Sequence, residues 1–92
     1  MIKTFRHKGL RGVFQDDDGS KLPSAMLERI RLILSALHAV QEIEGMDVPT
    51  FRLHPRKGDF KGLFSVTIRA NWRIIFRFED GDAFDVDFID YH

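Results

Sequence analysis

The stretch Trp72–Ile89, WRIIFRFEDGDAFDVDFI, decides the fold. Apolar residues alternate with mostly charged residues in each half of this stretch, and a period of two is typical of a strand with one buried face. The sequence Asp80-Gly81-Asp82 lies between the halves, and a glycine flanked by aspartates favours a turn. The stretch therefore predicts an antiparallel hairpin.

The register of this hairpin follows from side-chain parity. If Phe76 and Phe78 share a face with Phe84 and Val86, the numbers of opposed residues add up to an even value, because successive side chains point to opposite faces. We therefore predict a three-residue loop, Asp80–Asp82, rather than a two-residue turn. This register pairs Phe78 with Phe84, Phe76 with Val86, Arg77 with Asp85, Arg73 with Ile89 and Trp72 with Asp90.

Upstream of the hairpin, the same reasoning predicts three shorter strands and two helices. The strands are expected at 3–6, at 51–53 (ended by His54-Pro55) and at 64–69, where the period is again two. The helices are expected at 7–15 and from Pro23 to a stop at Gly45, where apolar residues recur at three-and-four spacing. Strands follow one another without intervening helices after Gly45, so we expect an α+β fold with two N-terminal helices packed on a mainly antiparallel sheet.

The composition restricts the class of protein. A chain of 92 residues predicts one domain, 1–92. The absence of cysteine excludes a disulfide framework and favours a reducing compartment. The first residues, Met1–Arg6, lack an apolar signal region, and apolar runs such as Ile74–Phe76 are too short to span a bilayer. We therefore expect a soluble, cytoplasmic protein with no membrane span.

Charge is unevenly distributed along a chain whose formal net charge is zero. The segment Arg52–Arg77 holds seven basic residues and one acid, whereas Glu79–Asp90 holds six acids and no base. Such segregation either creates an electropositive face suited to nucleic acid or provides ion pairs between neighbouring strands. Both interpretations remain open at this point.

Three segments carry the residue types that metal-free RNA cleavage requires, and the predicted sheet brings them to one end. They are Leu53–Asp59, Arg69–Arg73 and Asp90–His92. Cleavage needs a base for the 2′-hydroxyl proton, cations for the charge on the phosphorane and an acid for the leaving oxygen. The candidates are His54 and His92 for proton transfer, Lys57 and Arg73 for charge, Asp90 to orient an imidazole, and Tyr91 to stack on a base or bind its phosphate.

Each candidate also has a simpler interpretation. A histidine before proline is an ordinary end of a strand, a C-terminal histidine is usually frayed, and Arg73 can pair with an acid on the next strand. Further cations and one amide are candidates for binding the RNA backbone or are simply solvated, namely Arg52, Arg56, Lys61, Arg69 and Asn71.

A metal centre built from His54, Asp90 and His92 is the other use of these residues. No HExxH motif, cysteine pair or closely spaced ligand motif supports it. The sequence also lacks a glycine-rich phosphate loop between a strand and a helix. We therefore predict neither a metal nor a cofactor.

Several motifs along the chain resemble those of the HigB-type plasmid-maintenance killer toxins of the RelE superfamily. They are Phe5–Leu10, Leu53–Pro55, Lys57–Asp59, Lys61–Gly62, Asn71–Ile74, Phe76–Phe78, Gly81–Ala83 and Asp90–His92. Two places depart from the family pattern: Arg56 replaces a frequently apolar residue, and Leu63-Phe64 replaces an aromatic pair that ends in Trp. Neither departure touches a candidate catalytic group, so they bear on codon preference and packing.

The resemblance implies a RelE-like fold and an endonuclease that cuts mRNA in the ribosomal A site. It also implies a HigA-type helix-turn-helix antitoxin, which represses the operon together with the toxin, so that operator DNA is contacted through the complex. The active site that it implies consists of His54, Lys57, Arg73, Asp90, Tyr91 and His92, with Asn71 nearby. The alternative from another class is a catalytically inactive module that only engages the antitoxin and DNA.

Overall fold

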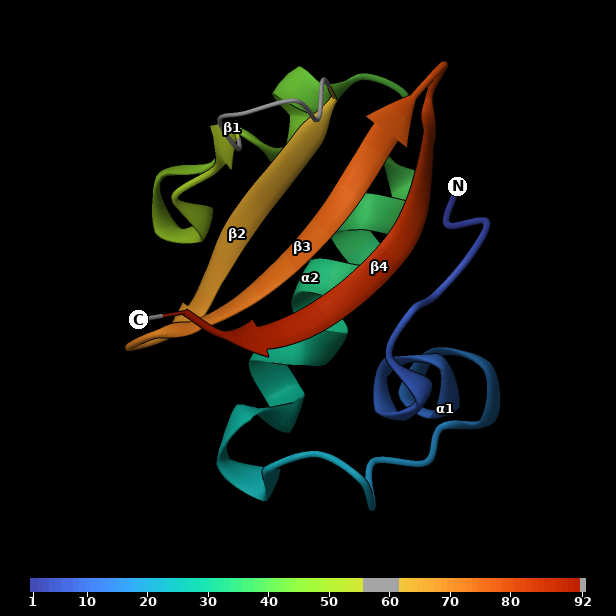
Figure 1. Ribbon diagram of the computed structural model, residues 1–92, viewed down its shortest axis with the longest axis vertical. Helices are drawn as coiled ribbons and strands as arrows, with labels where there is room; N and C mark the ends of the chain where they lie inside the picture. Colours follow the sequence, from blue (N-terminus) through green and yellow to red (C-terminus); the bar gives the residue numbers. More distant parts are fainter. Residues whose placement is uncertain (56–61, 92) are drawn as a thin grey trace.

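The computed structural model describes residues 1–55 and 62–91, and Figure 1 shows how the elements follow one another. The helices are α1 (Lys8–Asp16) and α2 (Leu27–Ala39), with short 3-10 helices η1 (Ser24–Met26), η2 (Ile43–Met46) and η3 (Pro49–Phe51). The strands are β1 (His54–Pro55), β2 (Leu63–Arg69), β3 (Trp72–Glu79) and β4 (Asp82–Asp90). No helix in these two described ranges is long and apolar enough to cross a membrane.

The four strands form one sheet in the order β1-β2-β3-β4, and every pair is antiparallel, which confirms the predicted pairing. The N-terminal segment runs along the outer edge of β4 (Figure 1). It contributes two isolated parallel bridges, Ile2 with Ala83 and Phe5 with Val86, where a strand at 3–6 was predicted. Residues 1–7 therefore cover an edge that would otherwise expose unpaired backbone groups.

The β3–β4 hairpin follows the predicted register only at its open end. Trp72 pairs with Asp90 and Arg73 with Ile89, but Arg77 lies opposite Phe84 and Phe78 opposite Ala83. The predicted pairs Phe78–Phe84 and Arg77–Asp85 are therefore wrong, and so is the three-residue loop.

The difference arises from a β-bulge at Asp85. Asp80 and Gly81 form the turn with φ values of 51° and 82°, and two positive φ values are typical of a tight type I′ hairpin. Asp85 has a φ of 55° and adds one residue to β4 where the register shifts. The extra residue shifts the register by one, so Trp72 lies opposite Asp90 as predicted even though the turn has two residues.

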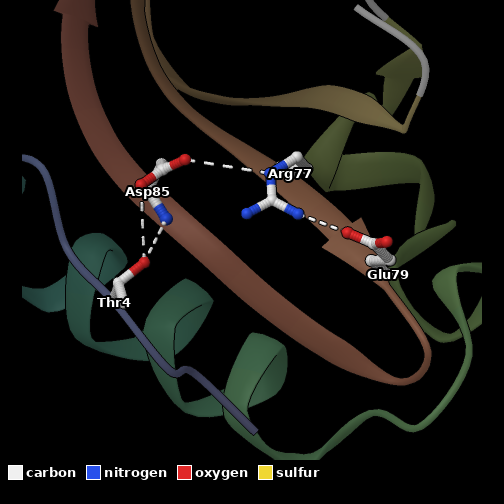
Figure 2. Close-up of polar contacts among 4 residues, drawn as sticks. All are labelled: Thr4, Arg77, Glu79 and Asp85. Atoms are coloured by element: carbon white, nitrogen blue, oxygen red, sulfur yellow. Dashed lines mark hydrogen bonds and ion pairs between the residues drawn. The ribbon is translucent and has the colours of Figure 1, made fainter.

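The N-terminal segment holds the bulge through Thr4 (Figure 2). The Asp85 amide donates to Thr4 Oγ1 at 2.7 Å, and the Val86 amide donates to the Thr4 carbonyl at 3.2 Å. The Thr4 hydroxyl in turn donates to Asp85 Oδ1 at 3.5 Å. A backbone amide that the bulge removes from the ladder is thereby satisfied.

The helix at 7–15 is confirmed within one residue, and His7 caps it. His7 Nδ1 accepts hydrogen bonds from the amides of Gly9 (3.0 Å) and Leu10 (3.3 Å). A Cβ atom on Gly9 would approach the His7 ring to 2.8 Å, so the capping imidazole requires glycine there.

Three boundaries differ from the prediction. The second helix begins at Leu27, after η1, rather than at Pro23. The second helix ends at Ala39 rather than at Gly45, because Val40 turns to an extended conformation with ψ of 144°. Gly45 instead lies within η2, where a Cβ atom would come within 2.6 Å of Val40. The strand predicted at 51–53 is also wrong: η3 ends at Phe51, and Arg52 adopts a left-handed φ of 50° before β1 begins.

Both helices share one hydrophobic cluster with the sheet, and Figure 1 shows α2 passing behind the strands. Its fully buried members are Leu10, Ile30, Ile33, Leu34, Leu37, Met46, Val66, Ile74, Phe76 and Val86. Strand residues that alternate with these face the other way. We call that side the outer face and define it by His54, Ser65, Thr67, Arg73 and Ile75.

We expect the Thr4 hydroxyl to stabilise the bulge. Thr4→Val keeps the shape of the side chain but leaves the Asp85 amide without its acceptor, so the free energy of unfolding falls by about 1 kcal/mol. Urea denaturation measures this, with Thr4→Ser as the matched control that retains the hydroxyl. Equal stability of the two variants would contradict the role given to the hydroxyl.

Candidate functional site

The end of the sheet formed by the β2–β3 turn is where the chain's C-terminal residues return. Ala70 and Asn71 make the turn, with Ala70 at a φ of 52°. Asp90 lies opposite Trp72, and the Tyr91 amide donates to the Asn71 carbonyl at 2.7 Å. The prediction that Asp90 lies beside Trp72 is confirmed, so the described part of the tail is held against the turn.

Aromatic packing supports this end of the sheet. The rings of Trp72 and Phe88 stack at 4.7 Å with an interplanar angle of 13°. The capping imidazole of His7 meets the Phe88 ring edge-on at 5.8 Å. Since Trp72 is the backbone partner of Asp90, this stack fixes the strand ends from which the tail emerges.

Arg73 keeps its positive charge uncompensated within the described residues. Its side chain is half-buried, and Nη1 donates to the carbonyls of Ala70 (2.6 Å) and Trp72 (3.2 Å). It makes no ion pair in residues 1–55 or 62–91. The carbonyls therefore position a guanidinium that retains further donors for an anion.

Arg77, four residues further along the same strand, has the opposite environment (Figure 2). It pairs with Glu79 and, at 3.8 Å, with Asp85, and it lies 4.5 Å over the Phe84 ring. The ion-pair interpretation of the charge pattern is therefore right for Arg77 but does not describe Arg73. Of these two arginines, Arg73 is the one that makes no ion pair in residues 1–55 and 62–91.

His54 approaches the site from the edge of the sheet. It is exposed on β1 and lies opposite Ser65, which is two residues before Thr67, the partner of Arg73. Strand spacing and rise place the Cα atoms of His54 and Arg73 roughly 12 Å apart. An extended nucleotide chain can contact both side chains across the outer face.

Ser65 and Thr67 are polar residues near these groups that were not predicted from the sequence. Their positions in β2 place both hydroxyls on the outer face between His54 and Arg73. Alternation predicted the direction of these side chains, but serine and threonine at such positions are too common in strands to indicate a site.

The other predicted residues are distributed as follows. Arg69 and Asn71 are exposed, at the end of β2 and in the β2–β3 turn respectively, and Arg52 is exposed at the end of η3. Four further predictions, Arg56, Lys57, Lys61 and His92, lie outside the described residues. Of the three predicted segments, the structure brings 69–73 and 90–91 together, whereas His54 joins them from the far side of β2.

The described groups can bind a phosphodiester, and of the metal centre considered from the sequence, His54 and Asp90 are described whereas His92 lies outside the described residues. In residues 1–55 and 62–91, no three histidine, aspartate or glutamate side chains are grouped so that they could hold an ion. The site offers an imidazole, an uncompensated guanidinium, a carboxylate and a phenol. Tyr91 is 50% exposed, which suits it to contact with a base.

Comparison with known proteins agrees with the motifs in the sequence. Residues 3–92 match the model of a family described as RelE-like toxin of type II toxin-antitoxin system HigB. The chain belongs to this HigB-like family. It is also 44% identical over 92 residues, the full length of both chains, to a protein of Proteus vulgaris named Endoribonuclease HigB. Membership of a type II toxin–antitoxin family implies an antitoxin partner.

The contrast between the two arginines of β3 predicts different effects on RNA binding. We expect Arg73→Ala to weaken binding of a 2′-O-methyl RNA, which resists cleavage, by about tenfold, because a charge-assisted hydrogen bond is worth about 1.5 kcal/mol or more. Arg77→Ala, which removes the same charge from the same strand, changes affinity by less than about threefold. Fluorescence anisotropy measures both, and equal losses would show that Arg73 has no special position.

Proposed function

We propose that this HigB-like toxin is an endoribonuclease that cleaves mRNA in the ribosomal A site and thereby stops translation. The family and the name of the Proteus vulgaris relative support the nuclease activity. The observation that carries the proposal is the uncompensated Arg73 next in the chain to Trp72, whose backbone partner is Asp90 in the docked tail. The relative's name supports an enzyme over a catalytically inactive module that binds only the antitoxin and DNA.

The proposed reaction uses the substrate's own 2′-hydroxyl as the nucleophile. A base removes its proton, the 2′-oxygen attacks the adjacent phosphorus, and an acid protonates the departing 5′-oxygen. His54 and His92 are the proton-transfer groups, with Asp90 orienting an imidazole. Such groups each contribute about 100- to 10,000-fold to the rate.

Charge stabilisation completes the mechanism. The phosphorane carries additional negative charge, and in this proposal Arg73 and Lys57 neutralise it. The carbonyls of Ala70 and Trp72 hold the Arg73 guanidinium before substrate arrives, which lowers the cost of ordering it in the transition state. No metal or cofactor is part of this proposal.

Tyr91 positions the nucleotide, and a second set of residues contacts the RNA backbone. That set consists of Arg52, Arg56, Lys61, Arg69 and Asn71. Exposed cations add affinity without sequence preference, so the selection of a codon depends on the groups around the β2–β3 turn.

The proposed setting is the cytoplasm, where the whole chain acts as a single domain. Its partners are the ribosome with bound mRNA and a HigA-type helix-turn-helix antitoxin. The toxin reaches operator DNA only through that antitoxin. The family supports an antitoxin in general, and the helix-turn-helix type is part of the proposal.

Primer extension on a reporter message tests this function directly. After induced expression of the toxin, we expect cuts within translated codons and no cuts when the start codon of the same message is removed. His54→Ala lowers cleavage at least about 100-fold, because it removes a proton-transfer group. His38→Gln, which changes a histidine on α2, leaves cleavage unchanged.

The outcomes separate the alternatives. Cuts in translated and untranslated messages alike would retain the nuclease and contradict ribosome dependence. Absence of any cut, with normal growth, would favour the inactive binding module.

A further inference from the structure

Four cations at the start of the chain belong to none of the contacts described above. Lys3 and Arg6 lie on the segment that borders β4, and Lys8 and Arg11 lie in the first turns of α1 (Figure 1). All four residues are exposed. We call them the N-terminal basic surface.

The charges of this surface are not compensated locally. Within residues 1–55 and 62–91, none of the four side chains makes an ion pair or a hydrogen bond. The first acidic residue of the chain is Asp16. Two neighbouring acids of β4 already have partners, since Asp82 lies 3.4 Å from the N-terminal ammonium and Asp85 pairs with Arg77.

The four cations form a strip that follows the chain from residue 3 to residue 11, along the edge of β4 and into the first turns of α1. Ile2 is buried and Phe5 is half-buried, and each forms a bridge to β4. The exposed Lys3 lies between these two bridges, and the exposed Arg6 follows the second. Lys8 and Arg11 are three residues apart in α1 and therefore lie on the same side of the helix. His7, between the two pairs, contacts Phe88, which stacks on Trp72. The middle of the strip is thus linked through Phe88 to Trp72, the backbone partner of Asp90.

We propose that the N-terminal basic surface binds the backbone of the substrate RNA beyond the nucleotide that is cut. This inference rests on the proposed function for the identity of the polyanion. The surface would contribute affinity for RNA and take no part in cleavage. Uncompensated lysine and arginine side chains release condensed counterions from a phosphate chain when they bind it. The four cations need not break any existing pair to do so.

The composition of the surface favours RNA over a protein partner. The exposed large apolar residues of the described chain are Met1, Leu32, Val48 and Tyr91, and of these only Met1 lies close to residues 3–11 in the sequence. Protein interfaces have an apolar or aromatic centre, whereas nucleic-acid interfaces are polar and strongly positive. A strip of four cations without such a centre fits the second class.

The test compares three double variants that each remove two positive charges. Two of them, Lys3→Gln/Arg6→Gln and Lys8→Gln/Arg11→Gln, lie in the surface. The third, Lys21→Gln/Arg31→Gln, is the matched control and lies before and within α2. Binding of a 2′-O-methyl RNA of about 20 nucleotides is measured by fluorescence anisotropy between about 50 and 200 mM salt, and thermal unfolding checks that each variant is folded.

Each surface variant is expected to lose about tenfold in affinity for the long RNA. Its plot of log K against log salt becomes shallower by about 1.4, since each phosphate contact contributes about 0.7 for single strands. The control keeps the wild-type slope. With an oligonucleotide of about four nucleotides, near the lower limit of a single-strand site, the surface variants bind like the wild type because the RNA fills only the cleavage site.

Three results would overturn the inference. The surface variants could retain the wild-type slope, or the control could lose as much as they do, or they could retain RNA affinity while losing neutralisation by the antitoxin in co-expression. By contrast, a wild-type protein that shows the predicted binding but cuts no message would overturn the proposed function and leave this surface in place.

Discussion

The pairing of β4 with β3 through to Asp90 is the constraint on which the rest of the structure depends. It brings the described tail to the β2–β3 turn, where the Tyr91 amide bonds to Asn71. The same register places Arg73 on the outer face, next to Thr67 and separated from His54 by the strand β2. A slip of one residue would move Arg73 into the core and separate it from the tail. The Asp85 bulge, held by Thr4, is what reconciles this register with a tight turn.

Local electrostatics explains how a chain without net charge can bind a polyanion. The acids of β4 are largely engaged near their own strand: Asp85 pairs with Arg77, Asp82 pairs with the N-terminal ammonium, and Asp87 accepts from the Phe88 amide. Cations elsewhere remain uncompensated, above all Arg73 within the described residues. Net charge therefore says little about this molecule, because the arrangement of pairs decides which charges reach a ligand.

The sequence predicted the long strands, the first helix and the return of the tail, because each depends on periodicity or parity. It could not predict the bulge. The pattern of alternating residues does not reveal an extra residue in β4, because a shorter turn offsets the shift in register and Thr4, which is distant in the sequence, holds the bulge. The predicted end of the second helix at Gly45 is also wrong, because this glycine allows close approach to Val40 rather than ending a helix. At the site, residue types indicated Arg73, Asp90 and Tyr91, but only strand pairing reveals the hydroxyls of Ser65 and Thr67. The catalytic and RNA-binding roles of all the candidate residues, Lys57 and His92 included, remain predictions.

The most direct test of this account is amide hydrogen exchange of Tyr91 measured by NMR. A tail paired with the start of β3 predicts an amide that exchanges much more slowly than an unstructured terminus, together with a nuclear Overhauser contact between Trp72 and Asp90. Exchange of Tyr91 at the rate of a free peptide, with no contact between these strand ends, would contradict it. The carboxylate and phenol would then be separate from Arg73, and the site would not exist as described.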